Sequence, residues 1–202
     1  MIRVDTKRLN EPDHFELKCR EKGTKWLLAN PKAARKSNKR PKDFWSRFKP
    51  QLSDGFAELC AYSAMYEPVG TVDHFVPVDA DESLAYDWAN YRFASAWINS
   101  SKQKRVEILD PLLVQDGWFE VLLPSLQLVL VPDKVPEPLR TLAEKTLDHL
   151  HLRHDERVLR QRRSWYKLFQ ESELTLEGLR QRAPLIAAAV DKAHRLKAQV
   201  KP

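Results

Sequence analysis

The sequence has few cysteines and no long apolar run. Its 202 residues include two cysteines, Cys19 and Cys60, which are too few for a disulfide framework. No apolar run approaches the roughly 18 residues that a membrane span requires, and the N-terminus lacks the hydrophobic region of a signal peptide. A Walker-type phosphate loop, a G-x-S-x-G elbow and internal repeats are also missing. We therefore expect a cytoplasmic protein with both thiols reduced.

The length and composition are those of a folded protein. A chain of 202 residues has room for one substantial core with appended helices. Hydrophobic residues make up 43% of the sequence and six residues are tryptophan, which argues against disorder. We expect a single domain of the α+β class.

Acidic and basic residues are segregated along the chain beneath a net charge of +6. Residues 1–50 carry a net charge of +9, residues 51–100 carry −7, residues 101–150 carry −2 and residues 151–202 carry +6. Basic ends are suited to gripping a phosphate backbone, and the acidic quarter is suited to a cation. Charge blocks alone are common on solvated surfaces.

The most informative stretch is residues 71–102. A short β-prone run at residues 69–78 is followed by a turn-rich segment, an aromatic run at residues 86–93 and a helical pattern. Strand, loop, strand and helix in this order bring together five side chains that carry chemistry: Asp73, His74, Asn90, Asn99 and Lys102. The last two are one helical turn apart and share a face.

This arrangement resembles the HNH, or ββα-metal, nuclease motif. Asp73-His74 corresponds to its D-H pair, Asn90 to its middle residue and Asn99 to its terminal asparagine. The letters DHF-P, YDWANY and N-x-x-K are most similar to the short HNH proteins of retron- and Septu-type anti-phage systems, and the likeness extends along most of the chain. The resemblance implies a role in bacterial anti-phage defence beside an ATPase partner.

The same resemblance implies the domain organisation. A ββα-metal core at residues 67–104 would follow an N-terminal basic and helical region at residues 1–66. An additional β-hairpin and C-terminal helices at residues 105–202 would complete the chain.

Phosphodiester hydrolysis suits these residue types. It needs a water deprotonated near neutral pH, where histidine titrates, so His74 is the expected general base. A hard cation such as Mg²⁺ or Mn²⁺ prefers oxygen ligands, which Asp73 and Asn99 would supply. We expect Asn90 to bond to backbone near His74 and hold the loop, and Lys102 to contact phosphate as a point charge.

The structural zinc knuckle of the resembled family is missing. That pattern places two Cys-x-x-Cys pairs around the site, whereas here the corresponding positions are Cys60, Ser63, Ser95 and Ile98. Serine and isoleucine are not zinc ligands, and a structural site needs about four nitrogen or sulfur donors. We therefore expect no structural zinc, with the catalytic residues left intact.

Two basic segments are candidates for contacting nucleic acid. Residues 30–43 form a basic arm without apolar periodicity, and an expected helix at residues 155–170 carries a basic stripe with i, i+3, i+7 spacing. The candidate contacts are Lys32, Arg35, Lys36, Lys39, Arg40 and Lys42 in the arm and Arg160, Arg163 and Lys167 in the helix. The arm is equally compatible with a solvated linker.

Outside the motif the pattern predicts a hairpin and further helices. Two β-prone runs flank a Pro-Ser turn within residues 118–131. Helices are expected at residues 44–65, broken at Pro50, and at residues 138–151, 155–170 and 175–197, the last interrupted at Pro184. Three histidines at a predicted helix junction lack a completing carboxylate or thiol set and are interpreted as structural or surface residues: His149, His151 and His154.

Other interpretations of the motif stay open. Each residue taken singly also fits an ordinary role, as part of a strand end, a turn or a helix cap. Taken together, the residues favour a DNA endonuclease. One alternative is a catalytically inactive HNH scaffold that binds nucleic acid or supports assembly. Another is an RNase with the same core, because the sequence does not show how a 2′-OH would be sensed.

Overall fold

The computed structural model describes residues 1–32 and 40–199. Contacts divide the chain into two compact units, each built from segments that are separate in the sequence. The unit that we call the site unit contains Asp5–Glu58 and Val69–Val106. The C-terminal unit contains Met1–Val4, Leu59–Pro68 and the chain from Glu107 onward.

The described residues form helices and two small antiparallel sheets, so the α+β expectation is confirmed. The strands are β1 (Thr71–His74), β2 (Tyr91–Ala94), β3 (Phe119–Leu122) and β4 (Gln127–Leu130). The α-helices are α1 (Glu21–Ala29), α2 (Lys49–Gly55), α3 (Ala96–Lys102), α4 (Glu137–His149), α5 (Glu156–Gln170), α6 (Leu176–Arg182) and α7 (Pro184–Gln199). Short 3₁₀ or π segments lie at Thr6–Arg8, Glu16–Arg20, Ser46–Phe48, Glu82–Tyr86, Trp88–Asn90, Pro111–Leu113 and Pro132–Lys134.

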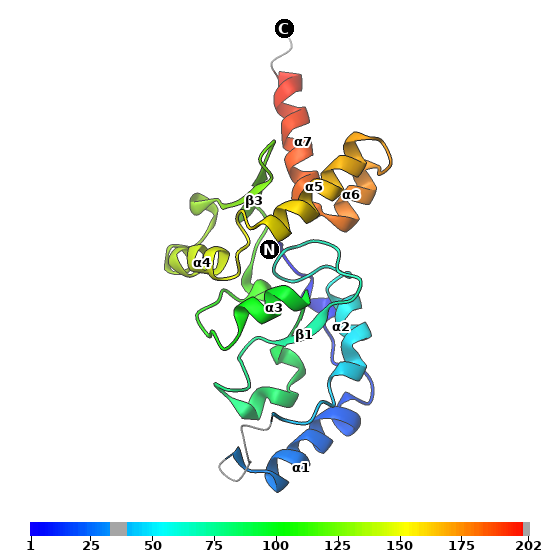
Figure 1. Cartoon of the computed structure of the whole chain (residues 1–202), viewed down its shortest axis with the longest axis vertical. Helices are drawn as coiled ribbons and strands as arrows, with labels where there is room; N and C mark the ends of the chain where they lie inside the picture. The colour runs from blue at the N-terminus through cyan, green and yellow to red at the C-terminus, as the bar shows by residue number, and fades with distance from the viewer. Residues whose placement is uncertain (33–39, 200–202) are drawn as a thin grey trace. The chain divides into compact units, whose positions relative to one another are not determined.

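In the site unit, strands β1 and β2 pair and α3 packs against β1 (Figure 1). The strand register sets His74 opposite Tyr91. Gly70 leads into β1 where the backbone passes very close to β2. A Cβ at Gly70 would lie 2.5 Å from the ring of Phe93 and 3.0 Å from the carbonyl oxygen of Ala94, so this approach requires glycine.

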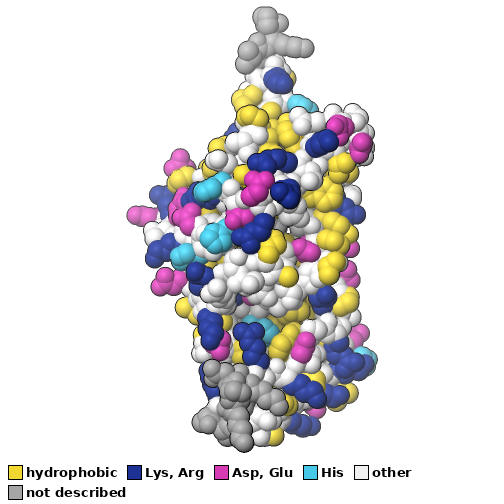
Figure 2. All heavy atoms as spheres, viewed as in Figure 1, with side chains coloured by type: hydrophobic (Ala, Val, Ile, Leu, Met, Phe, Trp, Pro, Cys, Tyr) yellow, Lys and Arg dark blue, Asp and Glu magenta, His cyan; other side chains and the backbone are white. Residues whose placement is uncertain are grey.

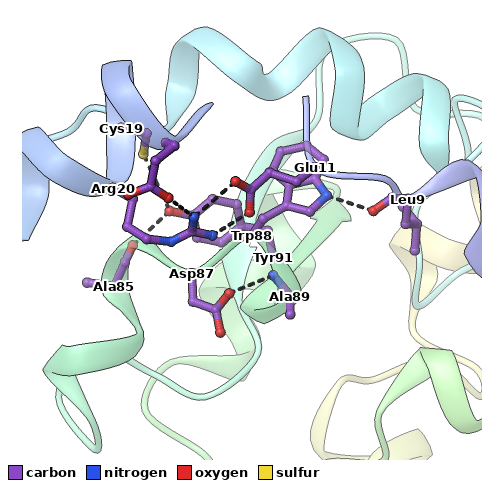
Figure 3. Close-up of polar contacts among 10 residues, drawn as sticks. Leu9, Glu11, Cys19, Arg20, Ala85, Asp87, Trp88, Ala89 and Tyr91 are labelled. Carbon is purple, nitrogen blue, oxygen red and sulfur yellow. Dashed lines mark hydrogen bonds and ion pairs between the residues drawn. The ribbon is translucent and has the colours of Figure 1, made fainter. Parts of the chain in front are cut away.

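Four aromatic rings form the core beneath this strand pair. Phe15 is fully buried, and its ring centroid lies 5.0 Å from Phe48, 5.3 Å from Trp88 and 5.9 Å from Tyr91. All three contacts are edge-to-face, the geometry that the ring quadrupoles favour. Trp88 also donates its indole N–H to the carbonyl of Leu9 at 2.8 Å (Figure 3). The N-terminal residues are thereby attached to the segment that carries β2.

The helix predicted for residues 44–65 is shorter than expected. Pro50 does not break it, because this proline occupies the first turn of α2, where it costs no hydrogen bond. The helix ends instead at Gly55, after which Ala57 and Glu58 take positive φ angles of 54° and 59°. Residues beyond them form an isolated bridge between Leu59 and Tyr66.

In the C-terminal unit, the predicted hairpin is confirmed as β3 paired with β4. The predicted C-terminal helices are also present, with the expected interruption at Pro184 separating α6 from α7. The buried guanidinium of Arg162, on α5, donates to the carbonyls of Leu126, Leu152 and Arg153. These bonds connect α5 to the hairpin and to the segment before the helix. Within the described residues, no helix is both long enough and apolar enough to cross a membrane.

Candidate active site

A groove of about 900 Å³ in the site unit brings together three of the predicted motif residues. Asp73 and His74 reach it from β1, and Asn99 reaches it from α3. The segment of residues 40–46 forms another part of its wall, with Arg40, Asp43 and Trp45 among the lining residues. Residues more than 50 positions apart in the sequence therefore meet at one surface.

His74 is half-buried and has a fixed ring orientation. Its Nε2 lies 2.9 Å from the carbonyl oxygen of Ala85, so Nε2 carries a proton and donates it to this bond. In the neutral ring Nδ1 is then the acceptor. The ring also makes edge contacts with Trp45 and Tyr91, at centroid distances of 4.7 and 5.1 Å. Burial lowers the pKa of His74 below its ordinary value of 6.5, which favours the neutral form.

The carbonyl of Ala85 is shared by a second donor. The hydroxyl of Tyr91 donates to it at 2.8 Å and lies 3.9 Å from the sulfur of Cys19 (Figure 3). Burial raises the pKa of the Cys19 thiol to about 11, so the thiol stays protonated and donates to the Tyr91 oxygen. This chain of contacts holds the Ala85 carbonyl in place and with it the tautomer of His74.

Asn90 is tied to the loop that follows β1. Its Oδ1 accepts from the backbone N–H of Val76 at 2.8 Å, and its Nδ2 donates to the carbonyls of Val76 at 3.0 Å and Leu84 at 3.2 Å. These are bonds to backbone near His74, the type of contact that the sequence predicted for Asn90. Any part in catalysis stays a prediction.

The side chain of Lys102 lies inside the site unit, and its expected contact with phosphate stays a prediction. Its Nζ lies 2.9 Å from Oδ1 of Asp73 and 2.6 Å from the carbonyl oxygen of His74. The side chain of Lys102 is only 1% exposed and that of Asp73 only 2%. Lys102 is not one of the described residues that line the groove. Because α3 packs against β1, Lys102 at the end of α3 points at the strand. The ammonium instead stabilises a buried carboxylate.

Asp73 and Asn99 are the candidate oxygen ligands for a cation. Asn99 is half-buried, and its side chain makes no hydrogen bond with another residue in the described part of the chain. No group of three or more His, Cys, Asp or Glu residues in the described ranges is arranged to hold a metal. One carboxylate and one amide nevertheless fit a hard ion such as Mg²⁺, which keeps several waters and needs few protein ligands.

The four positions of the zinc knuckle are all buried. Cys60 is 1% exposed, Ser63 is 3%, Ser95 is 4% and Ile98 is 0%. The prediction that the chain holds no structural zinc is not tested by this arrangement.

The predicted basic arm lies partly outside the described residues, which include Lys32, Arg40 and Lys42 but not Arg35, Lys36 or Lys39. Lys32 donates to the carbonyl of Asp79 at 3.1 Å. Arg40 lines the groove that contains Asp73 and His74. Lys42 is exposed, and its Nζ lies 5.4 Å from the ring centroid of Phe44. Among the three described cations of the arm, only Arg40 lines this groove.

The predicted basic stripe on α5 is exposed but is paired with acidic residues. Glu156 forms ion pairs with Arg160 and Arg163, and Glu171 pairs with Lys167. Where Figure 1 places α5, Figure 2 shows basic side chains interspersed with acidic ones. A phosphate would have to compete with these carboxylates, so the stripe is a weaker candidate than the arm.

Sequence reasoning missed two residues beside the motif. Arg92 lies opposite Asp73 in the strand register, is 4% exposed, and places its guanidinium 5.1 Å from the ring centroid of Phe75. Trp45 packs its ring edge against His74. All four residues of β2 are buried, so no alternation of strand residues indicated Arg92. Trp45 comes from a segment 29 positions before His74, and no local pattern connects the two.

Comparisons with known proteins do not extend this picture. No protein-family model matches the chain, and no match was found among curated proteins or solved structures. The groove and its side chains are therefore the features of the molecule that bear on its function.

Proposed function

We propose that the chain is a metal-dependent HNH-type endonuclease that hydrolyses phosphodiester bonds in DNA. One observation carries the proposal: Asp73, His74 and Asn99, whose types and spacing resemble the HNH motif, line one groove. These residues lie on β1 and α3, and the order β1, β2, α3 is that of a ββα-metal core. Asn90 supports the loop beside them.

His74 is the general base of this proposal. With Nε2 donating to Ala85, Nδ1 is the nitrogen that accepts a proton. The attacking water gives its proton to Nδ1 while its oxygen bonds to phosphorus, and the bond from phosphorus to the 3′ oxygen breaks. A lowered pKa keeps the ring neutral and ready to act at neutral pH.

Asp73 and Asn99 would hold Mg²⁺ or Mn²⁺ through their oxygens. The ion would supply positive charge where charge develops on the phosphate and the leaving oxygen. Lys102 is a positioning residue in this scheme, because it binds the Asp73 carboxylate and the His74 carbonyl at once. It fixes the end of β1 from inside the unit.

The biological setting is a separate part of the proposal. The likeness of residues 71–102 to the short HNH proteins of anti-phage systems supports a role in bacterial defence with an ATPase as partner. Complex formation with an ATPase encoded beside this chain, and a change in nuclease activity on binding it, would test that assignment.

A second candidate function is favoured by the Asp73–Lys102 pair. An ammonium 2.9 Å from Asp73 already compensates the charge of that carboxylate, which reduces the attraction for a cation. The chain would then be a nucleic-acid-binding or assembly subunit on an HNH scaffold without turnover.

A cleavage assay separates the two candidates. Plasmid, single-stranded DNA and RNA are incubated with the protein in Mg²⁺, in Mn²⁺ or in EDTA. The nuclease proposal expects cleavage in either metal, none in EDTA, and loss of cleavage in His74→Ala with nucleic-acid affinity nearly unchanged, because a general base acts on the chemical step. His194→Ala, which alters an exposed histidine on α7, is the matched control.

Cleavage by His74→Ala within about tenfold of the original rate would place the active site elsewhere. Nucleic-acid binding without cleavage under any metal condition would support the second candidate. Cleavage of RNA alone would retain the site and change the substrate.

A further inference from the structure

Trp45 is an aromatic side chain in the candidate active-site groove that the motif chemistry does not use. It lines the groove together with Asp73 and His74. Its ring centroid lies 4.7 Å from that of His74, with the two rings nearly perpendicular at 86°. A second contact, 5.6 Å between centroids, joins it to Tyr86.

Trp45 differs from the structural tryptophan nearby. Trp88 is 6% exposed, and its indole N–H is satisfied by Leu9. Trp45 is half-exposed, and its indole N–H has no hydrogen-bond partner among the residues that the structure describes. A tryptophan that is neither fully packed nor satisfied by the protein has both a ring surface and a donor available to a ligand.

Arg40 is a cation of the groove that is available to an anionic ligand. Arg40 lines the same groove and forms no ion pair with the described part of the chain. The three carboxylates of the groove are each engaged within the protein. Asp43 accepts from the backbone N–H and the hydroxyl of Ser46, Asp73 pairs with Lys102, and Asp79 pairs with Lys104. An aromatic ring and an available arginine in one groove are the combination that binds a base and its phosphate together.

We propose that Trp45 stacks an unpaired nucleobase next to the scissile phosphate, so that the substrate is single-stranded or locally unpaired nucleic acid. This inference rests on the proposed nuclease function and names its substrate class. The bases of a duplex are covered by their neighbours, and only an unstacked base offers its face to an aromatic side chain. The contact between Trp45 and His74 sets such a base beside the general base.

The test measures binding without cleavage. Affinity for a fluorescent single strand and for a duplex of the same sequence is measured by anisotropy in EDTA, with DNA and RNA versions of each. Trp45→Leu keeps an apolar side chain but removes the aromatic face, and Trp45→Phe keeps a smaller face. Trp165→Leu is the control, because Trp165 is also half-buried and does not line the groove.

Trp45→Leu is expected to weaken single-strand binding about tenfold, Trp45→Phe to weaken it less, and both to leave duplex binding unchanged. Trp165→Leu is expected to change neither. Should Trp45→Leu unfold, as judged by circular dichroism, Trp45→Phe and quenching of tryptophan fluorescence by the single strand still decide the question. Equal losses for single strand and duplex, or no loss for either, would overturn the proposal.

Failure of this inference can be told apart from failure of the nuclease proposal. Cleavage of a hairpin with an unpaired loop in Mg²⁺ is followed for the original protein and for Trp45→Leu. Equal cleavage of the loop by the original protein and by Trp45→Leu would support the nuclease proposal and overturn the stacking proposal. Single-strand binding that depends on Trp45, with no cleavage, would support the stacking and overturn hydrolysis.

Discussion

The ammonium nitrogen of Lys102 lies 2.9 Å from Oδ1 of Asp73, with both side chains almost fully buried. The two residues are 29 positions apart, on α3 and β1. Their pairing joins the helix to the strand at the candidate site. A buried charge without a partner is energetically unfavourable. The charge on each of these two residues therefore offsets the cost of burying the other.

Removal of Lys102 is expected to destabilise the fold strongly. Lys102→Met leaves the Asp73 carboxylate buried without its ammonium partner and should lower the free energy of unfolding by about 3–5 kcal/mol. Lys104→Met is the control, because Lys104 pairs with Asp79 at the surface and should cost at most about 1 kcal/mol. Urea denaturation measures both. Similar small losses would show that the buried pair contributes little.

The pH dependence of stability should report the burial of His74. Its pKa in the folded protein is lowered from 6.5, so below that pH the unfolded chain takes up a proton that the folded chain resists. Stability is therefore expected to fall as the pH drops below about 6.5. His74→Gln should flatten this slope, and His194→Gln should leave it unchanged. The same pH dependence of stability in His74→Gln as in the original protein would contradict the burial of His74.

Asn90 is expected to contribute strongly to the stability of the loop that follows β1. Asn90→Ala leaves the half-buried N–H and carbonyl of Val76 without their side-chain partner, at up to about 1–3 kcal/mol for each unsatisfied group. Asn10→Ala removes an exposed bond to the carbonyl of Lys7 and should cost much less. Thermal unfolding compares the two variants. Equal shifts in Tm would show that the loop does not depend on Asn90.

Features that depend on local backbone preferences were predicted better than those that depend on long-range packing, although the break expected at Pro50 was wrong. The interruption between α6 and α7 at Pro184 and the turn between β3 and β4 depend on local backbone preferences. Both were therefore predictable from the sequence. The burial of Lys102 depends on how α3 packs against β1, and spacing alone could not distinguish that from exposure to phosphate. Trp45 reaches His74 only through the fold, because the two belong to segments without a shared pattern.

The absence of a structural zinc is a prediction that elemental analysis can test. Serine at positions 63 and 95 and isoleucine at position 98 provide no thiolate or imidazole. Protein purified without a metal-affinity tag should contain well under one zinc per chain. A tightly held zinc would require another ligand set, and variants of His149, His151 and His154 would then be examined first.

The basic arm should govern binding strength without setting the chemistry. Each phosphate that a cation neutralises releases counterions, so binding through the arm weakens steeply with salt. Replacing its six cations with serine should lower affinity for any sequence and flatten the dependence of log K on log salt concentration. The six are Lys32, Arg35, Lys36, Lys39, Arg40 and Lys42.

The stripe on α5 supplies the matched control for the arm. Its cations already pair with Glu156 and Glu171, so serine at Arg160, Arg163 and Lys167 should change affinity and salt dependence less than the arm variant does. Asp73 and His74 are intact in both variants, and cleavage at saturating substrate should largely persist. An unchanged salt dependence in the arm variant would identify the arm as a solvated linker. The phosphate contacts would then be assigned to the basic stripe on α5.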